Sequence, residues 1–228
     1  MKRLVIVVAY NEEGRVGGVV KAVLKHGNVV VIDDGSSDAT AAEGKGAGAE
    51  VLSHPRNMGV GAAMKTGMRH ALSKGYDECV IMSGDGQCRP EFVPKMFKAL
   101  EQNDVCLISR FLGDVSNMPR ERYFGNRLFT GLMRIATGRK VSDASCGYRG
   151  LKNEFIESLP LDRMSDDYRF EVQMLIRILR GDWKYEELPM PAFYDEQKRT
   201  KMRIWRDWPL MVSPILREMV RIRGWRTR

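Results

Sequence analysis

Short apolar runs alternate with amphipathic segments along most of the chain. The runs are rich in β-branched residues, which favour strands, whereas the intervening segments repeat their apolar residues every three or four positions, as helices do. The expected strands span residues 4–9, 29–32, 50–53, 79–82, 105–109 and 184–188. The expected helices span residues 15–26, 39–48, 90–102, 120–137 and 166–179, with a further one that ends near residue 73. This alternation with short connections predicts an α/β domain with an open, mostly parallel sheet and helices on both faces.

Polar clusters follow four of the expected strands. They comprise residues 10–13, 33–38, 56–61 and 83–87. In a parallel sheet the carboxyl ends of the strands meet at one edge, and ligands bind in the crevice outside that edge. The alternative is that residues such as Asp34 or Ser36 only cap the helices that follow them. Four separate caps would all have to lie along the same edge, so the pattern favours a ligand site there.

Asp85 and Gln87 stand two residues apart on a turn flanked by glycines. They suit Mg²⁺ or Mn²⁺, because hard cations take few protein oxygens and complete their shell with water and phosphate. The chain has neither a GxGxxG motif after its first strand nor a P-loop, so it lacks both common phosphate cradles. A diphosphate would therefore depend on a metal and on basic side chains, which Arg149 and the loop at residues 198–201 supply.

Composition narrows the class of protein. The 228 residues suit one α/β domain with additions, and the formal charge is +8. Residues 198–228 hold ten Lys or Arg against two acids, so the charge belongs to the tail, where it is interleaved with large apolar residues; this argues against a nucleic-acid-binding protein. The four cysteines show no CxxC pairing, which indicates buried thiols in a reducing compartment. Without a signal peptide or an 18-residue apolar run, we expect a cytoplasmic protein with no membrane span of its own.

The C-terminal segment predicts a basic amphipathic helix over residues 204–228. Apolar residues recur there at three- and four-residue steps, at Ile204, Trp208, Met211, Ile215, Met219 and Ile222. Such a stripe with arginines beside it favours contact with an anionic membrane surface. The alternative is that the stripe packs on the preceding domain or on a second subunit. Pro209 and Pro214 are expected to limit any single long helix.

Several short motifs together resemble a known family. They are AYNEE at residues 9–13, VIDDGSSD at 31–38, NMG at 57–59, GDGQ at 84–87 and SCGYR at 145–149. The combination resembles the family 2 glycosyltransferases with the GT-A fold, within them the dolichyl-phosphate mannose synthase and polyprenyl-phosphate sugar transferase branch, over about residues 3–203. The resemblance implies a catalytic domain at 1–203, followed by the helix at 204–228. It also implies an inverting transfer of a sugar from a UDP- or GDP-linked donor to a polyprenyl phosphate, at the inner face of the cell membrane.

The resemblance also assigns roles to residues. Nucleotide-binding positions are Ala9, Tyr10, Asn11, Glu12, Asp34, Asn57 and Gly59, while Asp33 is expected to brace its loop. Asp85 and Gln87 match the DxDxQ metal motif, but Ser83 replaces its first aspartate, so a Mg²⁺ or Mn²⁺ ion loses an anionic ligand or takes it through water. Residues with a catalytic role in stabilising the diphosphate are Asp85, Arg149, Lys198 and Lys201, and candidates for the acceptor phosphate are Arg122, Arg127 and Ser145.

The chemical nature of the acceptor determines whether the reaction needs a general base. A lipid phosphate is already an anion and needs no strong base, so catalysis would consist of positioning and charge neutralisation. A sugar hydroxyl would need a carboxylate base, for which Asp167 and Glu171 are candidates. A nucleotidyltransferase would share the sheet architecture but carry a Gly-rich basic loop after the first strand, where this chain has acidic residues. The sequence leaves a homodimer open.

Overall fold

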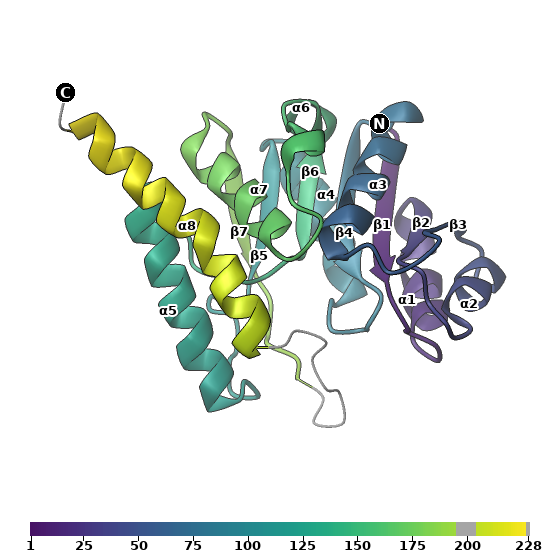
Figure 1. Ribbon diagram of the computed structural model, residues 1–228. Coiled ribbons are helices and arrows are strands. Elements are labelled where there is room, and N and C mark those ends of the chain that lie inside the picture. The colour runs from purple at the N-terminus through teal and green to yellow at the C-terminus, as the bar shows by residue number, and fades with distance from the viewer. Residues whose placement is uncertain (195–203, 227–228) are drawn as a thin grey trace.

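The computed structural model describes residues 1–194 and 204–226, and for 204–208 and 221–226 it gives only the course of the helix. Within these residues seven strands form one sheet in the order β3-β2-β1-β4-β6-β5-β7 (Figure 1). The strands are β1 Arg3–Ala9, β2 Asn28–Asp33, β3 Glu50–Ser53, β4 Glu78–Ser83, β5 Val105–Ser109, β6 Arg149–Lys152 and β7 Tyr185–Pro189. β6 is antiparallel to both of its neighbours, β4 and β5, and every other pair is parallel. The predicted mostly parallel sheet is confirmed.

Helices cover both faces of the sheet. They are α1 Val16–Val23, α2 Thr40–Gly46, α3 Val60–Ser73, α4 Val93–Leu100, α5 Arg120–Thr137, α6 Asn153–Glu157, α7 Arg169–Arg180 and α8 Ile204–Arg226. Alternate residues of β1 enter two cores: Leu4 and Ile6 pack with residues of α3 and α5 to α8, whereas Val5 and Val7 pack with α1 and α4. A central strand with both faces covered must be apolar throughout, which explains the uninterrupted run in the sequence.

Strand β6 is absent from the strands that the sequence pattern predicts. The chain enters β6 at Arg149, whose Cα pairs with Ile81 of β4 and Leu107 of β5. A Cβ at Gly150 would approach Leu100 to 3.2 Å, so glycine suits the narrow space where β6 passes the helix α4. A four-residue strand of mixed polarity has no periodic signal. Its position is fixed by pairing on both sides, which the local sequence does not reveal.

Helix α8 is a single helix, although it contains Pro209 and Pro214. The expectation that these prolines limit a long helix is therefore wrong. Pro214 has no N–H to donate to the carbonyl of Leu210, four residues earlier. The hydroxyl of Ser213 donates to that carbonyl at 2.8 Å, which compensates for the missing backbone bond.

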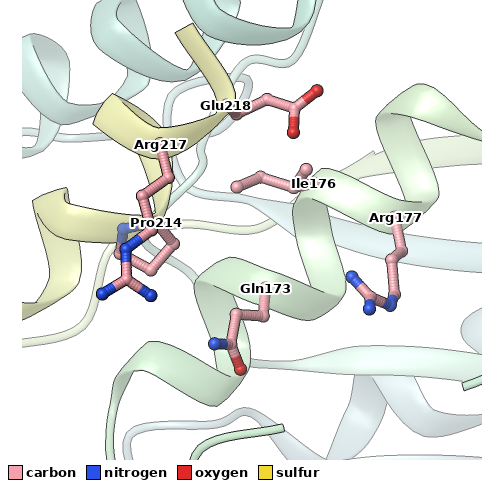
Figure 2. Close-up of a pocket in the computed structure, with 6 residues that line it drawn as sticks. All are labelled: Gln173, Ile176, Arg177, Pro214, Arg217 and Glu218. Atoms are coloured by element: carbon pink, nitrogen blue, oxygen red, sulfur yellow. The ribbon is translucent and has the colours of Figure 1, made fainter. Parts of the chain in front are cut away.

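The inner face of α8 packs against α5. Met211 and Ile215 are buried in the same core as Phe129 and Met133 of α5. This observation favours the packing alternative for these two members of the predicted stripe, while the side chains of residues 204, 208 and 222 lie outside the described part of the chain. A shallow hollow of about 200 Å³ separates α8 from α7 and is lined by Gln173, Ile176, Arg177, Pro214, Arg217 and Glu218 (Figure 2).

Two further expectations concern the chain as a whole. Cys79, Cys106 and Cys146 are buried free thiols, and Cys88 is a half-buried one, in agreement with the predicted reduced state. In the part of the chain that the structure describes, no helix combines the length and the apolar character that a bilayer span requires.

Candidate active site

The loops after β1, β2 and β4 are joined at the carboxyl edge of the sheet. The backbone N–H of Asp34 donates to the carbonyl of Ala9 at 2.9 Å, and the N–H of Gly84 donates to that of Val8 at 2.8 Å. The polar clusters at residues 10–13, 33–38 and 83–87 therefore lie side by side, as parallel topology requires.

Asn11 links the loops after β1 and β2. Its backbone has φ +50°, a left-handed conformation that is uncommon outside glycine and occurs often at functional sites. Its N–H donates to the hydroxyl of Ser36 at 2.9 Å, and its side-chain oxygen accepts the N–H of Ser37 at 2.9 Å. These two bonds hold the strained residue in place. They fix the backbone next to Tyr10, which is half-buried.

Glu12 is buried beside this link. Its N–H donates to the hydroxyl of Thr40 at 2.7 Å, and its carboxylate lies 2.6 Å from the guanidinium of Arg15. The predicted nucleotide-binding residues Ala9, Tyr10, Asn11 and Glu12 thus form one rigid segment.

Asp34 braces the loop that follows β3. Its carboxylate accepts the backbone N–H groups of Met58 and Gly59 at 2.9 Å each and lies 2.7 Å from Nδ1 of His54. Asp33 makes a more local bond and accepts the N–H of Ser36 at 3.0 Å. Asp33 thus holds its own loop, as expected, and Asp34 in addition braces the loop after β3.

The loop that Asp34 holds also meets the segment before α7. Gly59 has φ +104°, and a Cβ there would press on the backbone carbonyl of Asp166. Only glycine adopts this conformation readily and leaves room for that carbonyl. Asn57, on the same loop, is exposed at the rim of the edge.

The turn after β4 presents oxygen ligands. The carboxylate of Asp85 accepts the N–H of Gln87 at 2.9 Å, and the hydroxyl of Ser83 accepts the N–H of Asp85 at 3.3 Å. Among the described residues, no group of three or more His, Cys, Asp or Glu side chains could hold a metal by itself. One carboxylate, one amide oxygen and one hydroxyl are hard ligands, so this set fits a Mg²⁺ or Mn²⁺ ion that phosphate and water also coordinate.

Arg110 and Asp143 form a buried ion pair that the sequence interpretation missed. The guanidinium of Arg110 donates to both carboxylate oxygens of Asp143, at 2.7 and 3.0 Å, to the hydroxyl of Ser145 at 2.8 Å and to that of Tyr194 at 3.0 Å. Burial acts to raise the pKa of Asp143, but the charge and hydrogen bonds of Arg110 hold it below its ordinary value. Arg110 could have been identified from the sequence, because it is a charged residue that directly follows an expected strand, at the same sheet edge as the other polar clusters.

Arg149 lies beneath the site and not on its surface. The side chain is 1% exposed, and one guanidinium nitrogen donates to the backbone carbonyl of Glu171 at 3.0 Å. Burial lowers the pKa of Arg149, against the opposing charge of Glu171. Within the described residues its Nε has no hydrogen-bond partner, so the buried cation retains donor capacity.

Glu171 faces Gly147 in the loop before β6. A Cβ at Gly147 would collide with the carboxylate of Glu171. Burial raises the pKa of Glu171, although Arg149 and Arg110 act to lower it. The other candidate base, Asp167, pairs with Arg169 at 2.8 Å, and hydrogen bonds from that residue outweigh partial burial and lower its pKa.

The remaining predicted residues are dispersed. Arg127 is exposed on α5 with its guanidinium 5.4 Å from the ring centre of Phe111, and Arg122 is half-buried on the same helix. Lys198 and Lys201 lie outside the described residues. The structure thus brings the nucleotide-binding candidates, Asp85 and Ser145 to one edge, with Arg149 below it.

Comparison with known proteins agrees with this arrangement. Residues 4–159 match the sequence model of Glycosyl transferase family 2, which is more than half of the chain. The chain belongs to this family. It is therefore a glycosyltransferase, and the enzyme class inferred from the motifs is confirmed.

The family 2 glycosyltransferase is similar to two named relatives over most of its length. It is 30% identical over 213 residues to undecaprenyl-phosphate mannosyltransferase of Micrococcus luteus, covering 89% of this chain and 88% of the relative. It is 26% identical over 214 residues to UDP-N-acetylglucosamine–dolichyl-phosphate N-acetylglucosaminyltransferase of Methanococcus voltae, covering 84% and 85%. These names agree with the branch that the motifs indicate.

A solved structure confirms the fold. Glucosyl-3-phosphoglycerate synthase from Mycobacterium tuberculosis, in complex with Mn²⁺, UDP-glucose and phosphoglyceric acid, superposes with a TM-score of 0.71. The match covers 96% of this chain and 78% of the synthase, at 18% identity. The predicted GT-A fold of this glycosyltransferase is confirmed.

Proposed function

We propose that this protein transfers a sugar, with inversion, from a UDP- or GDP-linked donor to a polyprenyl phosphate at the inner face of the cell membrane. The observation that carries the proposal is the 30% identity to a polyprenyl-phosphate sugar transferase across 89% of the chain. A likeness of that extent reaches beyond the donor half of the domain into the segments that surround Ser145 and α5. The alternative of a nucleotidyltransferase is set aside by the family assignment.

The donor nucleotide would lie against the segment from Ala9 to Glu12 and the loop that carries Asn57 and Gly59. The strained, doubly hydrogen-bonded Asn11 supports this role, because its backbone is held in one conformation before ligand arrives. Asp34 would act mainly by holding the loop of Gly59 in place, since its carboxylate already accepts two backbone N–H groups. Such pre-organisation lowers the entropy cost of binding.

Asp85 and Gln87 would hold a Mg²⁺ or Mn²⁺ ion together with the diphosphate. The ion supplies positive charge that stabilises the leaving nucleoside diphosphate. The similar synthase structure contains Mn²⁺ together with UDP-glucose, which supports a divalent cation in this fold. Lys198 and Lys201 remain proposed partners of the diphosphate. Arg149, buried below the edge, would contribute its charge from beneath.

The acceptor phosphate would bind near Ser145, with Arg122 and Arg127 as further cationic partners. Ser145 is supported for this role because Arg110 and Asp143 both hydrogen-bond its side chain and so fix its hydroxyl. A phosphate oxygen is already an anion and can attack the sugar without a strong base. The domain would then act by orienting two negatively charged substrates and neutralising their repulsion.

One observation favours a second candidate, transfer to a saccharide hydroxyl. Glu171 is a carboxylate beside the loop that carries Ser145, and burial raises its pKa, as a general base requires. The two functions differ in their need for this group. Glu171→Gln should leave transfer to a phosphate acceptor largely intact and should abolish transfer to a hydroxyl.

The deciding experiment offers both acceptors to the purified full-length chain. Labelled UDP- and GDP-sugars are incubated with a polyprenyl phosphate or with free saccharides, with and without Mn²⁺, and the products are separated by solvent extraction. We expect label in the lipid phase only when polyprenyl phosphate is present. Label that enters only saccharide products would contradict the proposal.

A further inference from the structure

The outward face of α5 is apolar. Phe124, Leu128 and Ile135 are 68%, 56% and 72% exposed, although they belong to a helix whose inner face is buried in the core. Their spacing of four and seven residues places them in one stripe along the helix. A surface helix normally presents polar residues to water. A stripe of large exposed apolar side chains instead indicates an interaction surface.

Arginines line one side of this stripe. Arg120, Arg127 and Arg134 are exposed and recur every seven residues, so they lie one above another along the helix. The guanidinium of Arg127 lies over the ring of Phe111, and Nε of Arg134 donates to the carbonyl of Val141 at 2.6 Å. The face therefore combines apolar side chains with positive charge.

The neighbouring helix α8 also exposes apolar side chains. α5 and α8 lie side by side at one end of the sheet (Figure 1) and bury their inner faces in one core. On the outward side of α8, Leu216 and Val220 are 51% and 70% exposed, and Arg217 is exposed beside the hollow shown in Figure 2. This surface differs from the predicted stripe, of which Met211 and Ile215 face inward.

The stripe begins next to the acceptor side of the candidate active site. Phe111 directly follows Arg110, and its ring contacts Tyr123 with centroids 5.5 Å apart. Tyr123 in turn contacts the ring of Phe124, the first residue of the stripe, at 5.5 Å. Three aromatic rings in contact thus lead from the position next to Arg110 to the exposed apolar face.

We propose that the outer faces of α5 and α8 form one docking surface for an anionic lipid bilayer. The proposal rests on the proposed function, because a polyprenyl phosphate must present its headgroup at the site while its chain stays in lipid. The positive charge of this surface indicates which partner binds there, because arginines beside exposed apolar side chains complement anionic lipid headgroups. A second copy of the chain would bring the same arginines against each other, which disfavours self-association through this face.

Vesicle flotation tests the surface. The full-length chain is mixed with phosphatidylcholine vesicles with and without phosphatidylglycerol. The variant Phe124→Ser/Leu128→Ser/Ile135→Ser should lose binding to anionic vesicles by about tenfold or more, because each side chain loses apolar contact with lipid. Leu24→Ser, at an exposed apolar position outside both helices, should bind as the wild type does. All of these residues are exposed, so unchanged circular dichroism should accompany the loss.

A variant that removes positive charge from this surface provides a second test of vesicle binding. Arg120→Gln/Arg217→Gln should weaken binding to the anionic vesicles and leave binding to neutral vesicles unchanged. Lys21→Gln/Lys25→Gln, which removes two charges at the α1 end of the fold, should have no effect. Equal flotation of the wild type and the triple serine variant overturns the proposal. So does a wild-type dimer that the triple variant converts to a monomer, because the face would then join two copies.

Transfer to a short-chain, water-soluble prenyl phosphate separates this inference from the proposed function. The triple variant should retain the wild-type rate with that acceptor and lose activity only with long-chain acceptor in vesicles. If the wild type transfers no sugar to any prenyl phosphate, the proposed function fails, whereas the flotation result still decides the docking surface.

Discussion

Arg110 binds Asp143 through two side-by-side hydrogen bonds of 2.7 and 3.0 Å, and the carboxylate has no exposed side-chain surface. The pair joins the end of β5 to the loop before β6. We expect Asp143→Ala to destabilise the protein by about 3–5 kcal/mol, because it leaves the guanidinium buried without its counter-ion. Urea unfolding monitored by circular dichroism measures this. Asp162→Ala, which removes a surface partner of Arg69, should change stability by less than about 1 kcal/mol; equal losses in both variants would argue against a special role for the buried pair.

The same pair should make stability depend on pH in the acid range. The pKa of Asp143 is lower in the folded protein than in the unfolded chain, because Arg110 outweighs the effect of burial. Such a group stabilises the fold above its unfolded pKa of about 3.9, and the contribution is lost as the pH falls toward the lower folded value. Asp143→Asn cannot titrate. The difference in unfolding free energy between wild type and Asp143→Asn should stay constant above about pH 5 and shrink below about pH 4; a difference that is unchanged at the lower pH would refute the assignment.

Loss of the carboxylate at Asp85 should abolish sugar transfer and leave the fold intact. Asp85 lies on a turn at the carboxyl edge, and its carboxylate accepts a local hydrogen bond from the N–H of Gln87. We expect Asp85→Ala to reduce the transfer rate by about 100-fold or more, since the charge of the leaving diphosphate would be left uncompensated. Thermal unfolding should remain close to that of wild type. A fully active variant would remove Asp85 from the proposed cation site.

A methyl group at Gly147 should disturb the acceptor side of the site. The added Cβ would collide with the carboxylate of Glu171, whose side chain is half-buried. Gly147→Ala should cost about 1–3 kcal/mol and lower activity, as overpacking does. Gly18→Ala on α1 meets open space and should be neutral or slightly stabilising. Combining Gly147→Ala with Glu171→Ala should recover stability; failure to do so would mean that the collision is not the cause.

The sequence predicted those features that depend on local pattern and parallel topology. The apolar run of β1 and the polar segment at Asn11 follow from burial on both sheet faces and from the position of a strand end. The pairing of Arg110 with Asp143 could not be predicted, because its partners stand 33 residues apart and meet only through the fold. The same limit applies to β6, which has no pattern of its own.

Helix α8 shows a different limit. Periodicity identified an amphipathic helix, but apolar residues occur on both of its sides. Ile215 is buried and Val220 is 70% exposed, although both are apolar. The side of α8 that packs on the domain is determined by the surfaces of α5 and α7. The sequence of α8 by itself therefore does not predict which of its apolar residues are buried. The predicted boundary at residue 203 stays a prediction, since the inner face of α8 shares the core of the preceding helices.

The place of β6 between β4 and β5 has a consequence for how the protein folds. β4 and β5 are consecutive strands in the chain, yet they do not pair with each other. Both pair with β6, so they can enter one sheet only after residues 149–152 are in place. Until that segment is synthesised, both strands expose an unpaired edge, a state that is prone to wrong association. The loop with Ser145 immediately precedes this strand. Closure of the sheet and placement of the acceptor loop should therefore occur in the same late folding step.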